Sequence, residues 1–158
     1  MKIREFISAK AVSADLKAKD KEGVITELVD LIIDTGSIEK KSKKKVLEVL
    51  MAREALGSTA IGQGIAIPHA KHKSTKKLVG CLGVSKEGID FDSLDGELAH
   101  IFFLLMAPID SAGPHLKALA KISRLLKDKF VRERLKGAKD EEEIKKIIDQ
   151  EDDRLMSL

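Results

Sequence analysis

The residue best suited to chemistry in this chain is His69, which directly follows Pro68 and the short apolar run Ile65–Ile67. Proline has no backbone N–H to donate to a sheet ladder, so Pro68 marks the end of a strand. We therefore expect His69 at the rim of a sheet, where its side chain can meet another molecule. Histidine has an unperturbed pKa of about 6.5, and a neutral imidazole held on a rigid strand end is a nucleophile.

Two further residues could act beside this histidine. Arg53 is expected at the end of a helix, just before a glycine-rich loop, and arginine is the preferred planar donor to phosphate. The alternative for Arg53 is a surface ion pair with Glu54 or another acidic residue. His115 is expected at the start of another helix, and two histidines at element ends can converge on one site. The alternative for His115 is a helix-end residue without a role.

The other histidines and the cysteine favour structural or surface roles. His72 stands among lysines and is expected to be exposed, and His100 begins an apolar strand. His69 and His72 are three residues apart, but Pro68 favours a loop there and no cysteine or acid cluster joins them, so no metal site is predicted. Cys81 lies in the apolar run 78–84 and is expected to be a small buried hydrophobe.

The glycine-rich loop of residues 57–64 does not match a nucleotide site. Gly57 and Gly62 have the spacing that opens a P-loop, but the required Lys-Ser/Thr is absent. The dinucleotide fingerprint fails because Ile67 stands where a glycine or alanine is needed. The loop also leads into a strand, whereas both motifs need a helix N-terminus. Ser58 is not in a Gly-x-Ser-x-Gly elbow, so nothing favours a hydrolase.

Composition predicts one domain with one core. The chain has 158 residues, of which 43% are hydrophobic, enough to fill one core. Its net charge of +3 is too small to indicate nucleic-acid binding. Its single cysteine permits no internal disulfide and fits a reducing, cytoplasmic setting. The first residues lack the apolar stretch of a signal peptide, and the longest uncharged run, residues 98–109, is too short to span a bilayer.

The spacing of apolar residues, together with capping and turn residues, predicts helices at both ends of the chain and strands between them. Asp20 is expected to cap a helix that stops at Gly36, because apolar residues recur there at three- and four-residue spacing. The other helices are predicted over 42–53, 115–127, 131–135 and 141–148, with Asp140 as the cap of the last. Strands are predicted over 65–67, 78–84 and 99–106, with alternating apolar residues over 88–92 before a turn. This order of elements predicts a layered α/β domain.

The helix after His115 has the strongest amphipathic pattern of the chain. Its predicted inner stripe is Leu116, Leu119, Ala120, Ile122, Ser123 and Leu126.

Three sequence blocks together resemble a known family. They are Arg53–Gly62 running into Gly64–His69, then Gly88–Gly96, then His115–Ala120. They are similar to the active-site signature and two further blocks of the type-2 enzyme IIA domains, the fructose–mannitol and nitrogen-regulatory class of the bacterial phosphoenolpyruvate-dependent phosphotransferase system. The similarity covers nearly the whole chain.

The resemblance implies an α/β fold, a three-layer α/β/α sandwich around a central mixed sheet, formed as a single domain over residues 1–158. It implies that His69 is phosphorylated on Nε2 and that Arg53 and His115 belong to the phosphate site. The residues it places in the supporting loop are Ser58, Thr59, Gly62 and Gly64. It implies no metal and no cofactor. Pro114 departs from the family, where a threonine commonly precedes the histidine.

The resemblance also implies a function. The domain would accept a phosphoryl group from the histidine-containing phosphocarrier protein and pass it to a sugar-specific IIB domain of fructose or mannitol type. The membrane would be involved only indirectly, through a IIBC transporter, and nucleic acid not at all. Block 88–96 and residues 122–126 look slightly more fructose-like. Two alternatives stay open, a free-standing nitrogen-regulatory IIA protein that controls regulatory partners and a binding module that is never phosphorylated.

Overall fold

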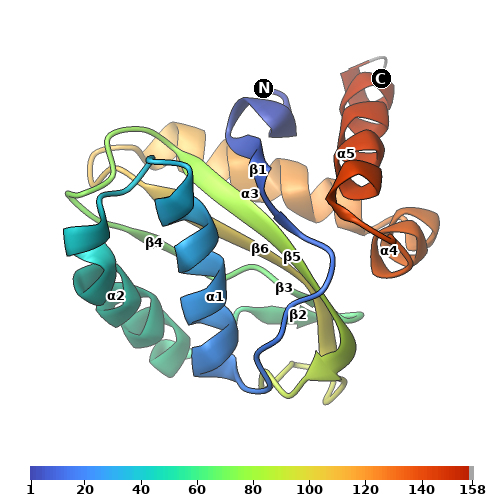
Figure 1. The fold of residues 1–158 in the computed structure, drawn as a ribbon, viewed down its shortest axis with the longest axis horizontal. Helices are drawn as coiled ribbons and strands as arrows, with labels where there is room; N and C mark the ends of the chain where they lie inside the picture. Colours follow the sequence, from blue (N-terminus) through green and yellow to red (C-terminus); the bar gives the residue numbers. More distant parts are fainter. Residues whose placement is uncertain (157–158) are drawn as a thin grey trace.

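A mixed β-sheet forms the middle layer of the protein (Figure 1). The computed structural model describes residues 1–156. Within them the strands are β1 (Ile7–Ser13), β2 (Ala60–Gly62), β3 (Ile65–Ala66), β4 (His69–Lys71), β5 (Val79–Ile89) and β6 (Ala99–Ala107). The order across the sheet is β1-β5-β6-β3-β2, and β4 also pairs with β6. Strands β5/β6 and β2/β3 are antiparallel, whereas β1/β5, β3/β6 and β4/β6 are parallel.

Helices cover both faces of this sheet, which confirms the predicted three-layer fold. The helices are α1 (Lys21–Asp34), α2 (Lys43–Leu56), α3 (Ala112–Leu126), α4 (Lys129–Lys136) and α5 (Glu141–Met156), with short 3-10 turns at Ile3–Glu5 and Lys40–Ser42. Helices α1 and α2 pack on one face, and α3, α4 and α5 on the other (Figure 1). In the described part of the chain, no helix is both long and apolar enough to cross a membrane.

Strand β6 lies at the centre of both core layers. Ile101, Phe103 and Leu105 face the α3–α5 layer, and Phe102 and Leu104 face the α1–α2 layer. All five side chains are fully buried. A strand covered on both faces reads as one continuous apolar run, and this is the pattern that made β6 predictable.

The predicted helix caps are confirmed. The Asp20 carboxylate accepts a hydrogen bond from the Gly23 backbone N–H at 2.7 Å, and Asp140 accepts from the Glu143 N–H at 2.9 Å. The last helix, however, runs to Met156, well beyond the predicted end at Ile148.

This longer last helix also anchors the start of the chain. Asp152 of α5 is fully buried and accepts from the backbone N–H groups of Ile3 at 2.7 Å and Arg4 at 3.0 Å. A buried carboxylate is tolerated there because two N–H donors satisfy it.

The strands around Pro68 differ from the prediction. Strand β3 ends at Ala66, two residues before Pro68, and His69 is the first residue of β4 and not the last residue of a strand. Both short strands pair with β6, and the Leu105 N–H donates to the Pro68 carbonyl at 2.9 Å. Pro68 therefore lies between the two short strands, where a residue without a backbone N–H is tolerated.

Helix α3 begins three residues before His115, and its inner face is rotated relative to the prediction. Leu116 and Ala120 are exposed, so the stripe was wrong at these two positions. His115, Ala118 and Ile122 are buried instead. The early start places Pro114 in the first turn, where its missing N–H costs little, and His115 faces inward while Leu116 is exposed.

Candidate functional site

A cavity of about 760 Å³ lies at the β4 edge of the sheet, between α2 on one face and α3 on the other. Its principal lining residues are Arg53 and Leu56 from α2, His69 and Lys71 from β4, and His115 and Leu116 from α3. The structure thus brings together the three side chains that the sequence predicted for a phosphate site. Among the described residues no carboxylate lines this cavity, and two cationic side chains do.

The ring of His69 is held by the backbone two residues before it. Its Nδ1 lies 2.7 Å from the carbonyl oxygen of Ile67. A carbonyl oxygen can only accept, so the hydrogen bond places the ring proton on Nδ1. In the neutral ring Nε2 then carries the free lone pair. The side chain is half-buried and lines the cavity, so the geometry leaves Nε2 as the ring nitrogen without a bond to Ile67.

His115 lies beside His69, in surroundings that disfavour its charged form. The two ring centroids are 5.5 Å apart and the ring planes are tilted by 59°. Burial lowers the pKa of His115, and the nearby charges of His69 and Lys71 lower it further. Its Nδ1 is buried and has no hydrogen-bond partner within residues 1–156. Protonating that nitrogen would bury an N–H without an acceptor, which also disfavours the charged ring.

Arg53 is fixed at the wall of the cavity by the end of its own helix. Its Nη1 donates to the carbonyl of Gly57, the residue directly after α2, at 2.6 Å. The alternative, an ion pair between Arg53 and Glu54, is not what the structure has. The Glu54 carboxylate pairs instead with Lys21 at 3.1 Å.

The four predicted loop residues lie outside the cavity lining. The Ser58 hydroxyl donates to the Phe91 carbonyl, and the Thr59 hydroxyl donates to Glu54. Gly62 and Gly64 have φ angles of +104° and +80° in the tight turn between β2 and β3, where glycine is favoured. Direct support of a phosphoryl group by these four residues stays a prediction.

The remaining histidines and Cys81 have local roles. His72 is half-buried, and its Nδ1 lies 2.7 Å from the Ser74 hydroxyl, so its predicted exposure was wrong. His100 bonds the Ser85 carbonyl at 2.9 Å, as expected of a structural residue. Cys81 is fully buried, and burial raises the pKa of its thiol. Residues 1–156 contain no group of three or more His, Cys, Asp or Glu that could hold a metal ion.

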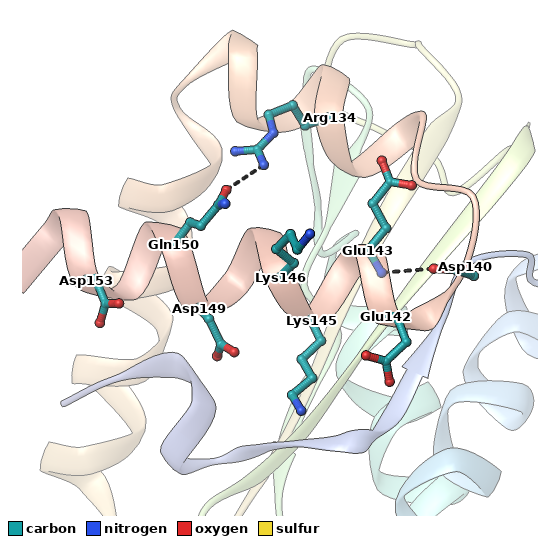
Figure 2. Close-up of a pocket in the computed structure, with 9 residues that line it drawn as sticks. All are labelled: Arg134, Asp140, Glu142, Glu143, Lys145, Lys146, Asp149, Gln150 and Asp153. Atoms are coloured by element: carbon teal, nitrogen blue, oxygen red, sulfur yellow. Dashed lines mark hydrogen bonds between the residues drawn. The ribbon is translucent and has the colours of Figure 1, made fainter.

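A second hollow, of about 700 Å³, runs along the outer face of α5 (Figure 2). Its side chains are charged or polar and belong mostly to one helix, as Figure 2 shows for Lys145, Lys146 and Asp149. Arg134 of α4 reaches across it and donates to Gln150 at 2.7 Å. None of the predicted site residues lines this hollow, and its alternating charges are those of a solvated helix face.

Comparison with known proteins identifies the family of this chain. Residues 5–151 match the family described as "Phosphoenolpyruvate-dependent sugar phosphotransferase system, EIIA 2". The chain is 38% identical over 152 residues to the "PTS system fructose-specific EIIABC component" of Bacillus subtilis, which covers 96% of this chain. The chain spans only 24% of the length of that relative.

Two solved structures share the fold. The nitrogen regulatory protein IIA-Ntr from Neisseria meningitidis superposes with a TM-score of 0.82 at 32% identity, over 92% of this chain and 98% of that one. The mannitol enzyme IIA from Escherichia coli, solved in complex with its phosphorylated enzyme IIB, superposes with a TM-score of 0.76 at 21% identity, over 90% and 96% of the two chains. By its sequence match, this chain belongs to the EIIA type-2 family of the phosphoenolpyruvate-dependent sugar phosphotransferase system.

Proposed function

We propose that this protein, a single domain over residues 1–158, is a cytoplasmic phosphocarrier. It accepts a phosphoryl group on Nε2 of His69 from the histidine-containing phosphocarrier protein and passes it to a IIB domain of fructose or mannitol type. The observation that carries the proposal is the bond between His69 Nδ1 and the Ile67 carbonyl, which leaves Nε2 as the nucleophile beside Arg53 and His115. The membrane is reached only through the IIBC transporter that receives the phosphoryl group.

The reaction exchanges one N–P bond for another. The Nε2 lone pair of neutral His69 attacks the phosphorus in line, while the bond from phosphorus to the donor nitrogen breaks. A donor ring protonated on its other nitrogen leaves as neutral imidazole, and His69 becomes a phosphoimidazolium whose Nδ1–H still bonds the Ile67 carbonyl. Charge spreads over three phosphoryl oxygens in a loose transition state, so positioning and charge stabilisation do most of the work.

Arg53 and His115 provide that stabilisation. Arg53 presents a planar guanidinium with five N–H donors, of which one bond is spent on Gly57. His115 buries Nδ1, so Nε2 is its ring nitrogen on the cavity side, and in the neutral ring this nitrogen carries the donating N–H. A neutral donor next to His69 leaves the neutral nucleophile undisturbed before transfer and still bonds a phosphoryl oxygen after it.

The rim of the cavity suits protein partners. Leu56 of α2 is 87% exposed and Leu116 of α3 is 65% exposed, on opposite sides of His69. Two large apolar side chains around a polar centre are typical of an interaction surface. The mannitol enzyme IIA whose fold this chain shares is solved with its phosphorylated IIB, and we assign an equivalent acceptor to this chain.

Phosphorylation itself is the first test. With phosphoenolpyruvate, enzyme I and the carrier protein, intact-mass measurement should show one acid-labile phosphoryl group on the wild-type chain. His69→Ala should show none, because Nε2 is the only acceptor, and the matched variant His72→Ala should gain the group normally. No gain on the wild-type chain in the presence of active upstream proteins would refute the phosphocarrier and the regulatory alternative together.

Removing the guanidinium should slow the transfer. We expect Arg53→Met to lower the rate of His69 phosphorylation on the order of 100-fold, because one donor to the developing charge is lost. The exposed Arg124→Met on α3 is the charge-matched control and should leave the rate unchanged. Quench-flow followed by mass measurement gives both rates, and an Arg53→Met rate equal to that of the control would remove Arg53 from the site.

The protonation state of His115 can be measured by NMR titration. Its midpoint should lie below the 6.5 typical of histidine, because burial disfavours the charged ring. His69→Ala and Lys71→Ala should each raise the midpoint, without reaching 6.5, since burial is the largest cause. Lys117→Ala, a neighbouring exposed lysine, is the control and should not shift it. A midpoint at or above 6.5 in the wild-type chain would contradict a neutral donor.

A regulatory role is the second candidate, and the similarity to IIA-Ntr over nearly that whole chain favours it. The phosphorylated protein separates the two, because only a transport component must discharge. We expect loss of the phosphoryl mass within seconds of adding IIB domains of fructose or mannitol type. Retention of the group against every such domain, with the carrier protein still able to take it back, would instead favour control of regulatory partners.

A further inference from the structure

We propose that Glu54, which does not line the cavity, is a positioning residue that holds the imidazole of His69 in its reactive tautomer. The contact runs from the buried Glu54 carboxylate to Thr59, from Thr59 to Ile67, and from Ile67 to His69. The inference rests on the proposed function of His69 and adds a residue to it. Glu54 acts through the backbone and touches no reacting atom.

The first link is a carboxylate fixed at both oxygens. Glu54 is 6% exposed, and its Oε1 accepts from the Thr59 backbone N–H at 3.0 Å and from the Thr59 hydroxyl. Its Oε2 lies 3.1 Å from Lys21 Nζ at the start of α1. Lys21 is itself held by Asp92 at 3.0 Å and lies 4.9 Å from the centre of the Phe91 ring. A buried carboxylate with two hydrogen-bond donors and a paired cation has little freedom to move.

The second link transfers this rigidity to the strand that precedes His69. The Thr59 carbonyl accepts from the Ile67 N–H at 3.0 Å. The peptide that follows Thr59 is held at its other end as well, because the Ala60 N–H donates to the Ser58 hydroxyl at 3.0 Å. Ser58 in turn donates to the Phe91 carbonyl. Ser58 and Thr59 therefore support the site through the backbone of Ile67.

The third link selects the tautomer. The Ile67 carbonyl, 2.7 Å from His69 Nδ1, is the group that keeps the proton on Nδ1. An unconstrained histidine favours the opposite tautomer, with the proton on Nε2, and that tautomer has no lone pair to offer at Nε2. Pro68 follows Ile67 and has no N–H, so on the β2 side the Thr59–Ile67 bond is what fixes this carbonyl.

The charge of Glu54 matters as well as its shape. Glutamine would keep an oxygen for Thr59, but its NH₂ group would face the Lys21 ammonium, and donor would meet donor. Alanine would leave the Thr59 N–H buried and unpaired. We therefore expect Glu54→Gln to shift part of the His69 population to the Nε2–H tautomer, and Glu54→Ala to shift more of it.

The test reads the tautomer directly in the unphosphorylated protein, where no partner is needed. Nitrogen-15 NMR of the wild-type His69 ring should show a protonated Nδ1 and a bare Nε2. In Glu54→Ala the two nitrogen shifts should move toward each other as the Nε2–H tautomer becomes populated, and Glu54→Gln should move them part of the way. The rate of phosphorylation should fall roughly tenfold in Glu54→Ala, as for other residues that orient a reacting ligand.

Asp152→Ala is the matched control. Asp152 is likewise a buried carboxylate with two backbone N–H donors, but it ties α5 to the start of the chain. Asp152→Ala should lower the urea midpoint of unfolding about as much as Glu54→Ala does, but it should not move the nitrogen shifts of the His69 ring. Wild-type shifts in both Glu54 variants would overturn the proposal, and Glu54→Gln decides it if Glu54→Ala does not fold. A wild-type chain that shows the expected tautomer but accepts no phosphoryl group would refute the proposed function alone.

Discussion

The hydrogen bond between the Ile67 carbonyl and the ring of His69 is the constraint on which the rest of the site depends. It is a contact between a side chain and its own backbone across Pro68, so the ring direction is set by the path of the main chain. That path is held on one side by Thr59 and on the other by Leu105 of β6. In the proposed function, the ring of His69 is thus oriented before a partner arrives, and little ordering remains to be done when that partner docks.

The position of the site at a sheet edge explains how side chains from opposite faces can meet. Arg53 belongs to the α1–α2 layer and His115 to the α3–α5 layer, which the sheet separates over most of its width. Within the described residues β4 pairs with β6 alone, so no further strand stands between the two layers outside β4. The ends of α2 and α3 therefore face one another across His69. A histidine on a central strand could have met a side chain from one layer only.

Much of this arrangement could be predicted from the sequence, and the failures have identifiable causes. The long helices and the buried strand β6 follow from apolar periodicity. Strand β1 was missed because three consecutive residues, 8–10, are exposed where its register to β5 shifts, which removes the alternation. Strands β2 and β4 have three residues each, too few for a period. The inward turn of His115 could not be read from the helix pattern, which favours the larger Leu116.

For the site as well, the local sequence predicts some features and misses others. The proline before His69 and the predicted positions of Arg53 and His115 at helix ends single these residues out as candidates. That the three side chains meet depends on the order of the strands in the sheet, which the local sequence does not reveal. Glu54 is the residue that sequence reasoning missed as a contributor, because a glutamate in the last turn of a helix reads as solvated. Its burial is made tolerable by Lys21, and only the packing of α1 against α2 brings the two together.

The use of one nitrogen for both transfers also limits how the proposed function can operate. Nε2 of His69 must face the donor when it receives the phosphoryl group and the acceptor when it gives the group away. Both partners then need the same rim, around Leu56 and Leu116, and cannot occupy it together. The domain must release one partner before it engages the next, as in a ping-pong scheme. A small apolar rim around a rigid polar centre suits this requirement, because short-lived complexes are formed by modest interfaces whose reacting groups are already in place.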